Sequence, residues 1–283
     1  MNVRELIAAG GVGSRFQPIV QLSDGSVVAH EALSRGPAGS ALECPRLLYG
    51  AAESEGCALE LDAACRALAL QCATESGWTA GTNGPLFLNV WPGALSRPAF
   101  LPELTAALAA VGRGPRDVVL EVNEAEHLDA HLDGPLAECR AAGFWIALDD
   151  AGAGRCGLHA IAEVVPDVVK VDRALVGGID QHRGRRAAVA ALARLARDLG
   201  IVLVAEGIET QGELRAVRDL GVPLGQGFLL GRPAPNPLVG RAAAFVAAAP
   251  GHTPSPVRLA APAGAAVRPG RRSRLSPPRG RTL

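Results

Sequence analysis

The chain has 283 residues, a formal net charge of zero, and a composition that is 48% hydrophobic and 4% aromatic. This length suits one large α/β domain with a substantial core, or two small domains. No run approaches the roughly 18–20 apolar residues of a membrane span, and the N-terminus does not read as a signal peptide. The six cysteines show no CxxC spacing, so we expect a reduced, cytoplasmic protein.

The zero net charge conceals two regions of opposite charge. Residues 1–250 hold all 28 acids but only 21 basic side chains, whereas residues 251–283 hold seven arginines and no acid. Six prolines and little apolar periodicity in that second region are typical of disorder, so we assign 249–283 to a basic tail. Two interpretations stay open for the tail: contact with nucleic acid or another anionic surface, and simple solvation.

The first predicted elements form a hairpin and two helices. After a short lead at 1–13, strand patterns at 15–20 and 26–33 flank an Asp24-Gly25 turn. This spacing predicts antiparallel pairing, because a parallel crossover needs a dozen or more residues. Helices are predicted over 45–54 and 59–76, and Asp62 interrupts the apolar pattern of the second as a candidate structural anchor.

From residue 86 onward, strand and helix patterns alternate. We expect strands at 86–90, 117–122, 144–148, 167–171, 201–205 and 225–230. Helices are expected near 99–110, 124–142, 157–163, 185–199, 210–220 and 236–248. With the hairpin this makes eight strands, which predicts an α/β fold: a (β/α)8-type, TIM-like barrel over 14–248 with an antiparallel first strand. A doubly wound open sheet is the alternative, although no GxGxxG fingerprint follows a first strand.

Polar side chains stand at the carboxyl ends of these predicted strands. In FWIALDDAGAG an apolar run ends in Asp149 and Asp150, and the arrangement recurs at Glu31, Asn89, Glu121, Lys170, Glu206 and Gln226. Because such strand ends meet at one face of a barrel, we expect a single site there. Lys170 is the only lysine beside 27 arginines, and a compact ammonium differs chemically from a guanidinium, so we expect a chemical role; chance is the alternative.

The five carboxylates of this set indicate metal chemistry. Brought together, they cannot all stay ionised without cations. Oxygen ligands without clustered His or Cys favour Mg²⁺ or Mn²⁺ over Zn²⁺. Two adjacent aspartates also suit a pair of ions, and paired ions stabilise both oxygens of a phosphoryl transfer. The residues therefore predict metal-assisted phosphoester hydrolysis.

Eight ordered motifs give the chain a specific family resemblance. They are FQPIV, HEALSR, LFLNVWP, LEVNE, LDDAGAG, VVKVDR, VAEGIE and QGFLLGRP. Over roughly residues 14–240 the chain resembles the EAL-domain cyclic di-GMP phosphodiesterases, whose namesake motif matches residues 31–33. The resemblance implies a barrel with one antiparallel strand, two Mg²⁺ or Mn²⁺ ions, hydrolysis of cyclic di-GMP to linear pGpG, and a homodimer. The alternative is a catalytically weak module that binds cyclic di-GMP or a protein partner as a receptor.

The same resemblance implies roles for individual residues. One ion would be held by Glu31, Asn89, Glu121 and Asp149. The second would be held by Asp149 as a bridge, together with Asp150 and Glu206. The catalytic group would comprise Lys170, which orients the attacking water, Glu206, which is the other candidate for activating that water, and Glu209, which supports the site. Substrate or loop contacts would come from Arg35 and Gln226, and Glu124 would anchor the loop after the aspartate pair.

That loop departs from the family pattern. The family commonly reads DDFGTGYSS, whereas this chain reads DDAGAGRCG, with substitutions at Ala151, Ala153, Arg155 and Cys156. The region contributes to the family's dimer, so its change bears on dimer coupling. Both aspartates and both glycines, Gly152 and Gly154, remain, and every metal-ligand position that the resemblance implies is filled, so we expect the enzyme to be active.

Two tryptophans beside strand ends, Trp91 and Trp145, have two possible roles. Packing is the simpler interpretation for both, and base stacking is the alternative.

Overall fold

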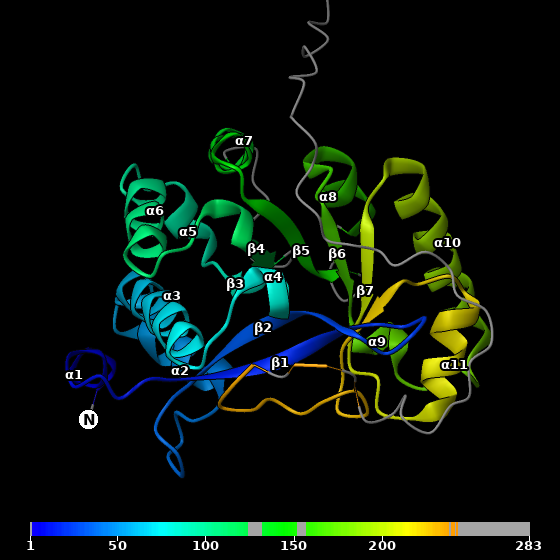
Figure 1. Cartoon of the computed structure of the whole chain (residues 1–283), viewed down its shortest axis with the longest axis horizontal. Coiled ribbons are helices and arrows are strands. Elements are labelled where there is room, and N and C mark those ends of the chain that lie inside the picture. The colour runs from blue at the N-terminus through cyan, green and yellow to red at the C-terminus, as the bar shows by residue number, and fades with distance from the viewer. Residues whose placement is uncertain (1, 124–131, 152–156, 238, 241, 243–283) are drawn as a thin grey trace, which may run out of the picture.

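The computed structural model describes residues 2–123, 132–151, 157–237, 239, 240 and 242. Eight strands form a closed barrel in chain order (Figure 1). They are β1 Gly13–Gln21, β2 Val27–Arg35, β3 Leu86–Asn89, β4 Val118–Asn123, β5 Trp145–Ala151, β6 Val168–Val171, β7 Val202–Ala205 and β8 Leu224–Gly225. β1 is antiparallel to both β2 and β8, and all other neighbours are parallel. The predicted barrel with a reversed first strand is confirmed.

Helices surround this barrel in Figure 1. They are α1 Val3–Ala8, α2 Pro45–Ser54, α3 Ala58–Glu75, α4 Ala80–Asn83, α5 Pro92–Leu95, α6 Phe100–Ala110, α7 Asp133–Ala142, α8 Gly157–Val164, α9 Arg173–Val176, α10 Arg183–Leu199 and α11 Gln211–Asp219, with a 3-10 turn at Pro115–Asp117. Among the residues described, no helix combines the length and the apolar character that crossing a bilayer requires.

Helix α10 illustrates how local sequence sets these boundaries. The His182 side chain accepts a hydrogen bond from the Arg185 amide and caps the amino end, and Gly200 with φ of 73° ends the helix in a left-handed turn. Val189, Ala193 and Ala196 recur at spacings of four and three, so they form one buried face. That face packs in the same apolar cluster as the outward side chains of β6 and β7.

The lead before the barrel also contains a helix. Asn2 and Glu5 form a capping box at the start of α1, and its buried Val3 and Leu6 pack with α2 and α3. The tail at 249–283 lies outside the described residues, so its assignment stays a prediction.

Two predicted elements differ from the structure. The last strand was expected over 225–230, but it has only two residues, because the chain turns after Gln226. Gly227 packs so closely on the Ile208 backbone that an added Cβ would lie 2.2 Å from it, and the Leu230 amide donates back to the Gly227 carbonyl. The backbone groups of this segment therefore form hydrogen bonds within a turn instead of hydrogen bonds to a neighbouring strand.

The helix expected over 236–248 is also wrong for the residues described there. Asn236, Gly240 and Ala242 are not helical. Instead, the Gly240 carbonyl accepts a hydrogen bond from the Val27 amide, and the Ala242 amide donates to Gly25. The backbone of this segment therefore pairs with the β1–β2 hairpin, and the remainder of the predicted helix lies outside the described residues.

The interior of the barrel has two layers. Its lower layer is apolar and consists of Ile19, Ala29, Phe87, Val119, Ala147, Val168, Val204 and Leu224. Two residues further toward the carboxyl end, each parallel strand places a polar residue on the same face, because side chains alternate with a period of two. The intervening residues, such as Leu88 and Val169, belong to the clusters that pack against the helices.

Candidate active site

Lys170 is the centre of the upper layer. Its side chain is 1% exposed, and its Nζ meets carboxylates from four other strands. The Nζ lies 2.7 Å from Glu206 Oε1, 3.1 Å from Glu31 Oε2 and 3.3 Å from Asp149 Oδ1, and it also contacts Glu121 Oε1. The structure thus brings together five residues that the sequence separates by up to 175 positions, from 31 to 206.

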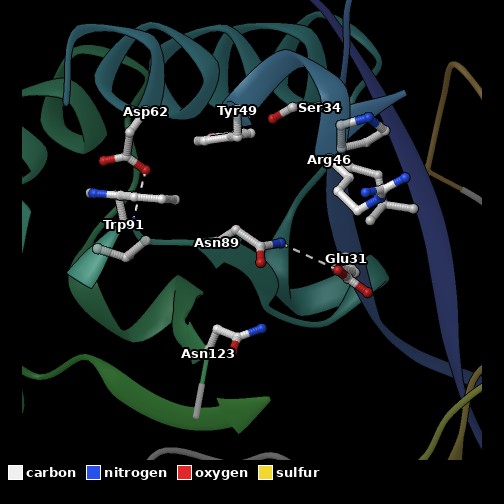
Figure 2. A pocket seen from close by; sticks show the side chains of 11 residues that line it. Glu31, Ser34, Arg46, Tyr49, Asp62, Asn89, Trp91 and Asn123 are labelled. Carbon is white, nitrogen blue, oxygen red and sulfur yellow. Dashed lines mark hydrogen bonds between the residues drawn. The ribbon is translucent and has the colours of Figure 1, made fainter. Parts of the chain in front are cut away.

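Two amide side chains complete this acidic cluster. Asn89 Nδ2 donates to Glu31 Oε1 at 3.3 Å, as drawn in Figure 2, and to Glu121 Oε2 at 3.4 Å. Gln226 Nε2 donates to Glu31 Oε2 at 2.7 Å and to Gln17 Oε1 at 2.9 Å. Glu31 therefore receives hydrogen bonds from both sides of the barrel, which fixes its orientation.

Gln17 is a site residue that the sequence analysis missed. It is 8% exposed, lies on β1 two residues before Ile19, and its Nε2 donates to the Gly231 carbonyl at 3.0 Å. Because β1 runs opposite to the other strands, its upper-layer residue precedes its lower-layer residue. The sequence predicted that the first strand is antiparallel. Counting its alternating side chains in the reverse direction would have placed Gln17 in the same layer as Glu31.

The electrostatics of the cluster show an excess of negative charge. Burial raises the pKa of Glu206 to about 8 and that of Asp149 to about 6, because the attraction of Lys170 only partly offsets the loss of hydration. Burial and the neighbouring Glu31 raise the pKa of Glu121 well above its usual range. Burial also raises the pKa of Glu31, but Lys170 and the hydrogen bond from Gln226 outweigh it, so that pKa is lowered.

The pKa of Lys170 is raised, so its side chain stays protonated and positively charged. Burial lowers it, but the surrounding carboxylates, of which Asp149 contributes most, raise it well above its usual range. One ammonium is therefore held among four carboxylates. The remaining negative charge requires protons or additional cations.

Asp149 and Asp150 reach the same end of the barrel through an irregular strand. Regular alternation would direct adjacent side chains to opposite faces. However, the pairing of β5 with β6 shifts register between Leu148 and Ala151, and Asp150 has a φ of 58°, which is unusual for a residue other than glycine. Asn123 Nδ2 holds the result in place by donating to Asp150 Oδ2 at 2.5 Å.

The oxygen atoms present at this site fit divalent cations. Asp149, Asp150 and Glu206 each offer a carboxylate oxygen, and these oxygens lie within 4.8 Å of one another. Glu121 Oε1 and Asp149 Oδ1 are buried, and within the described part of the chain each has the Lys170 ammonium as an ion-pair partner but no further hydrogen-bond donor. Hard oxygen donors with a surplus of negative charge suit Mg²⁺ or Mn²⁺.

A family model described as the EAL domain matches residues 1–233. The chain belongs to the EAL domain family. This membership confirms the family resemblance inferred from the eight sequence motifs. The matched region includes the whole EAL barrel and all residues of the acidic cluster.

Solved structures of EAL proteins resemble this EAL domain. Klebsiella pneumoniae BlrP1, in a manganese and cyclic di-GMP complex, is 33% identical with a TM-score of 0.72, over 79% of this chain and 56% of that one. A standalone EAL protein of Vibrio cholerae O395, in its c-di-GMP bound form, is 26% identical with a TM-score of 0.74, over 84% and 98%.

Curated relatives are longer proteins. One is the bifunctional diguanylate cyclase/cyclic di-GMP phosphodiesterase MucR of Pseudomonas aeruginosa, 30% identical over 245 residues, which are 83% of this chain and 35% of MucR. The chain spans about a third of the length of the curated relatives it matches.

Of three further predicted site residues, Glu209 lines the cavity that contains the acidic cluster, Arg35 is the last residue of β2, and Glu124 lies outside the described residues. Glu209 Oε2 pairs with Arg173 Nη2 at 2.9 Å at the rim, where both side chains are more than 40% exposed. Arg35 Nη1 donates to the Ser34 carbonyl at the end of β2. Glu124 and residues 152–156 of the altered loop lie outside the described residues, whereas Ala151 is buried in β5.

Glu213 is a second residue that the sequence analysis missed. Its buried carboxylate accepts backbone hydrogen bonds from Gly178, Glu209 and Thr210 at 2.8–2.9 Å. Burial raises its pKa, but these bonds outweigh burial and the pKa is lowered. Glu213 thus fixes the loop that follows Glu206. The capping-box spacing of Thr210 and Glu213 was a readable signal.

Asp62 anchors the segment that follows Asn89, as its interrupting position suggested. The Asp62 side chain is 1% exposed, its Oδ1 accepts a hydrogen bond from the Trp91 amide at 3.0 Å, and Arg66 contacts its other oxygen. This contact ties α3 to the chain two residues beyond Asn89.

Proposed function

We propose that this EAL domain is a metal-dependent phosphodiesterase that hydrolyses cyclic di-GMP to linear pGpG. The observation that carries the proposal is the single buried ammonium of Lys170 among four carboxylates, with a surplus of negative charge that divalent cations would neutralise. The likeness to BlrP1, which was solved with manganese and cyclic di-GMP, supports the same substrate and type of ion.

The residues of the site divide into two sets of ligands. Glu31, Asn89, Glu121 and Asp149 would hold one ion, and Asp149, Asp150 and Glu206 would hold the other. When bound, such ions act as Lewis acids toward the phosphoryl oxygens and lower the pKa of water. Asp149 belongs to both sets, so its negative charge would stabilise both ions.

The reaction requires a positioned water and a proton acceptor. Lys170 donates hydrogen bonds from a fixed, buried position, and this suits it to orient the attacking water. Glu206, with a pKa of about 8 in the protein alone, is the candidate to accept the proton of that water. The new P–O bond forms as the bond to the ribose 3′ oxygen breaks; that oxygen takes up a proton, and the product is linear.

We also propose that the protein is cytoplasmic and forms a homodimer. The basic tail at 249–283 would bind nucleic acid or another anionic surface. Light scattering on the full chain and on a chain lacking residues 251–283 tests the dimer and the contribution of the tail.

The second candidate function is a receptor that binds cyclic di-GMP or a protein partner without turnover. The altered loop after Asp150 favours it, because Ala151 stands where the family commonly has an aromatic ring. The candidate predicts binding without product.

One assay tests the proposal. The purified full chain is incubated with cyclic di-GMP and Mg²⁺ or Mn²⁺, and pGpG is quantified by chromatography. We expect pGpG to accumulate with time, and we expect no pGpG to form in excess EDTA. Calcium should inhibit, because its longer bonds and higher coordination number misplace the water. Tight binding without pGpG would favour the receptor.

A further inference from the structure

Arg173 joins two loops at the carboxyl-terminal face of the barrel. It is the first residue of α9 and follows Lys170 by three positions, in the connection after β6 (Figure 1). Its guanidinium reaches the loop after β7, where Nη1 contacts the Gly207 carbonyl and Nη2 donates to Glu209 Oε2 at 2.9 Å. The mechanism above gives Arg173 no part, although Arg173 lines the cavity of about 340 Å³ that contains the acidic cluster.

The aliphatic part of Arg173 packs directly against Gly207. A Cβ added to Gly207 would lie 2.8 Å from Cβ, Cγ and Cδ of Arg173, and the φ of Gly207 is 66°, in the region that favours glycine. A side chain at position 207 would therefore displace Arg173. Arg173 thus holds the same residue by packing on its α-carbon and by bonding its carbonyl.

The residue that precedes this turn is Glu206. Its Oε1 lies 2.7 Å from Lys170 Nζ, and its amide donates to the Val171 carbonyl at 3.0 Å. The chain is thus fixed by β6 before the Glu206 side chain and by Arg173 after it. A reacting group must be held to within about 0.5 Å to be productive, so the support of position 207 bears on where the Glu206 carboxylate lies.

Other contacts of the turn differ from Arg173 in burial. The Ile208 amide donates to the Gln226 carbonyl at 3.0 Å, and the buried Glu213 accepts the amides of the next two residues. The Arg173 side chain is 47% exposed. Because an exposed ion pair contributes little to stability, loss of Arg173 should alter the geometry of the site without unfolding the domain.

Direct binding of a substrate phosphate is a different role for a guanidinium in this cavity. Both terminal nitrogens of Arg173 are already engaged, one by the Gly207 carbonyl and one by the Glu209 carboxylate. The charge of Glu209 also offsets that of Arg173. These contacts favour support of the protein chain over recognition of an anion.

We propose that Arg173 is a positioning residue, which holds the turn at 207–209 so that the Glu206 carboxylate stays directed toward Lys170 and the second ion. The inference rests on the proposed function, which assigns Glu206 to that ion and to the proton of the attacking water. Arg173 therefore acts on the rate and on one ion, and it leaves substrate affinity and folding unchanged.

Arg173→Ala in the full chain tests this role. We expect kcat for cyclic di-GMP with Mn²⁺ to fall roughly 10- to 100-fold, the range typical of residues that orient metal ligands, with little change in KM. In a titration of metal-free protein with Mn²⁺, one of two binding steps should weaken by a similar factor. Arg173→Lys should recover part of kcat, because an ammonium keeps the charge beside Glu209 but lacks the fork that also reaches Gly207.

Arg4 offers a matched control. Its Nη1 donates to Glu60 Oε1 at 3.1 Å and its Nη2 to the Gly56 carbonyl at 2.9 Å, and both side chains are more than 50% exposed. Arg4→Ala thus removes the same kinds of contact from α1, outside the barrel. We expect unchanged kcat, Mn²⁺ binding and melting temperature.

Amide hydrogen exchange in the metal-free chain reports the turn without any catalysis. The amides of Ile208 and Glu209 should exchange faster in Arg173→Ala, at an unchanged melting temperature. If wild type forms no pGpG, faster exchange together with one weakened Mn²⁺ step still supports the inference, and only the proposed function fails.

Four results would overturn the inference. Hydrolysis by Arg173→Ala at the wild-type kcat overturns it and leaves the proposed function intact. A raised KM with unchanged kcat and Mn²⁺ binding shows that Arg173 binds substrate directly. A large drop in melting temperature gives Arg173 a structural role only, and wild type that binds no Mn²⁺ overturns both the inference and the proposed function.

Discussion

The two layers of the barrel interior differ in chemistry although the same eight strands build both. In the lower layer the strands present Ile19, Ala29, Phe87, Val119, Ala147, Val168, Val204 and Leu224, and none of these is charged. In the upper layer, two residues away on each strand, they present Gln17, Glu31, Asn89, Glu121, Asp149, Lys170, Glu206 and Gln226. The difference shows that one alternating backbone can place a packed core directly beneath a charged site.

The energetic consequences of the two layers are opposite. Burying apolar side chains stabilises the fold, whereas burying carboxylates costs free energy unless cations or hydrogen bonds satisfy them. The raised pKa values of Glu121, Asp149 and Glu206 are signs of that cost. Changes in the upper layer should therefore affect chemistry, and changes in the lower layer should affect stability.

The largest expected effect is on activity in Asp149→Asn. The substitution removes charge from the one carboxylate assigned to both ions, so turnover should fall by roughly 10³-fold or more, exceeding the 10²–10³ typical of one positioned contact. Steady-state hydrolysis of cyclic di-GMP with Mn²⁺ measures it. Asp198→Asn, on the exposed side of α10, is the control. Near-normal turnover in Asp149→Asn would show that the bridging role is wrong.

Lys170→Arg should have the next largest effect. A planar guanidinium is larger than the ammonium and would displace the water that Lys170 is proposed to orient. We expect turnover to fall about 10²–10³-fold, or roughly 3–4 kcal/mol of barrier, with little change in substrate affinity. Single-turnover rates and equilibrium binding separate the two quantities. Turnover within a few-fold of the parent would contradict the role of Lys170 in orienting the water.

Phe87→Ala tests the lower layer. Phe87 is fully buried, and truncation of such a ring costs about 3–5 kcal/mol of unfolding free energy through lost burial and a new cavity. Urea denaturation with EDTA measures the loss. Phe228→Ala is the control, because Phe228 is 47% exposed and should change stability by less than about 0.5 kcal/mol. A loss of under about 1 kcal/mol at Phe87 would contradict a tightly packed lower layer.

Manganese affinity should fall as the pH is lowered, because protons compete with the ions for the carboxylates of the upper layer. Glu206 and Asp149 hold protons below pH of about 8 and about 6, and bound ions must displace them. Apparent affinity should therefore fall about tenfold per pH unit below 8, and more steeply below 6. Because these pKa values exceed those of the unfolded chain, the metal-free protein should lose stability as pH rises from about 4.5 to 8. Calorimetric titrations at pH 6, 7 and 8 measure the affinity, and a flat profile would contradict the assignment.

Removal of residues 251–283 should have the smallest effect. The segment lies beyond the last barrel strand and lacks an apolar pattern. We expect an unchanged melting temperature and unchanged hydrolysis. A large drop in melting temperature would show that the segment packs on the barrel, and a selective loss of nucleic-acid or membrane affinity would give it a binding role.

The sequence predicted the barrel and its upper layer because both depend on local patterns. Each parallel strand carries its own apolar run and its own terminal polar residue, so Glu121 and Lys170 are visible without knowledge of the fold. The eight motifs, most of which begin on these strands, indicated the family, which the family model confirms.

Features set by tertiary contacts were not predictable in the same way. The turn after Gln226 depends on close packing with Ile208, although QGFLL has the composition of a strand. The pairing of Glu209 with Arg173 and the stacking of Tyr49 on Trp91 join segments at least 36 residues apart. Gln17 was missed for a different reason, since its strand runs in the opposite direction.

The count of bound ions tests the central claim most directly. Mn²⁺ is titrated into metal-free protein at pH 8, and free Mn²⁺ is measured by electron paramagnetic resonance. If the upper layer is a two-ion site, wild type binds two Mn²⁺ per chain, and Asp149→Asn loses affinity at both positions while Asp198→Asn does not. Wild-type protein that folds normally yet binds no Mn²⁺, or binds it equally well in Asp149→Asn, would contradict the claim.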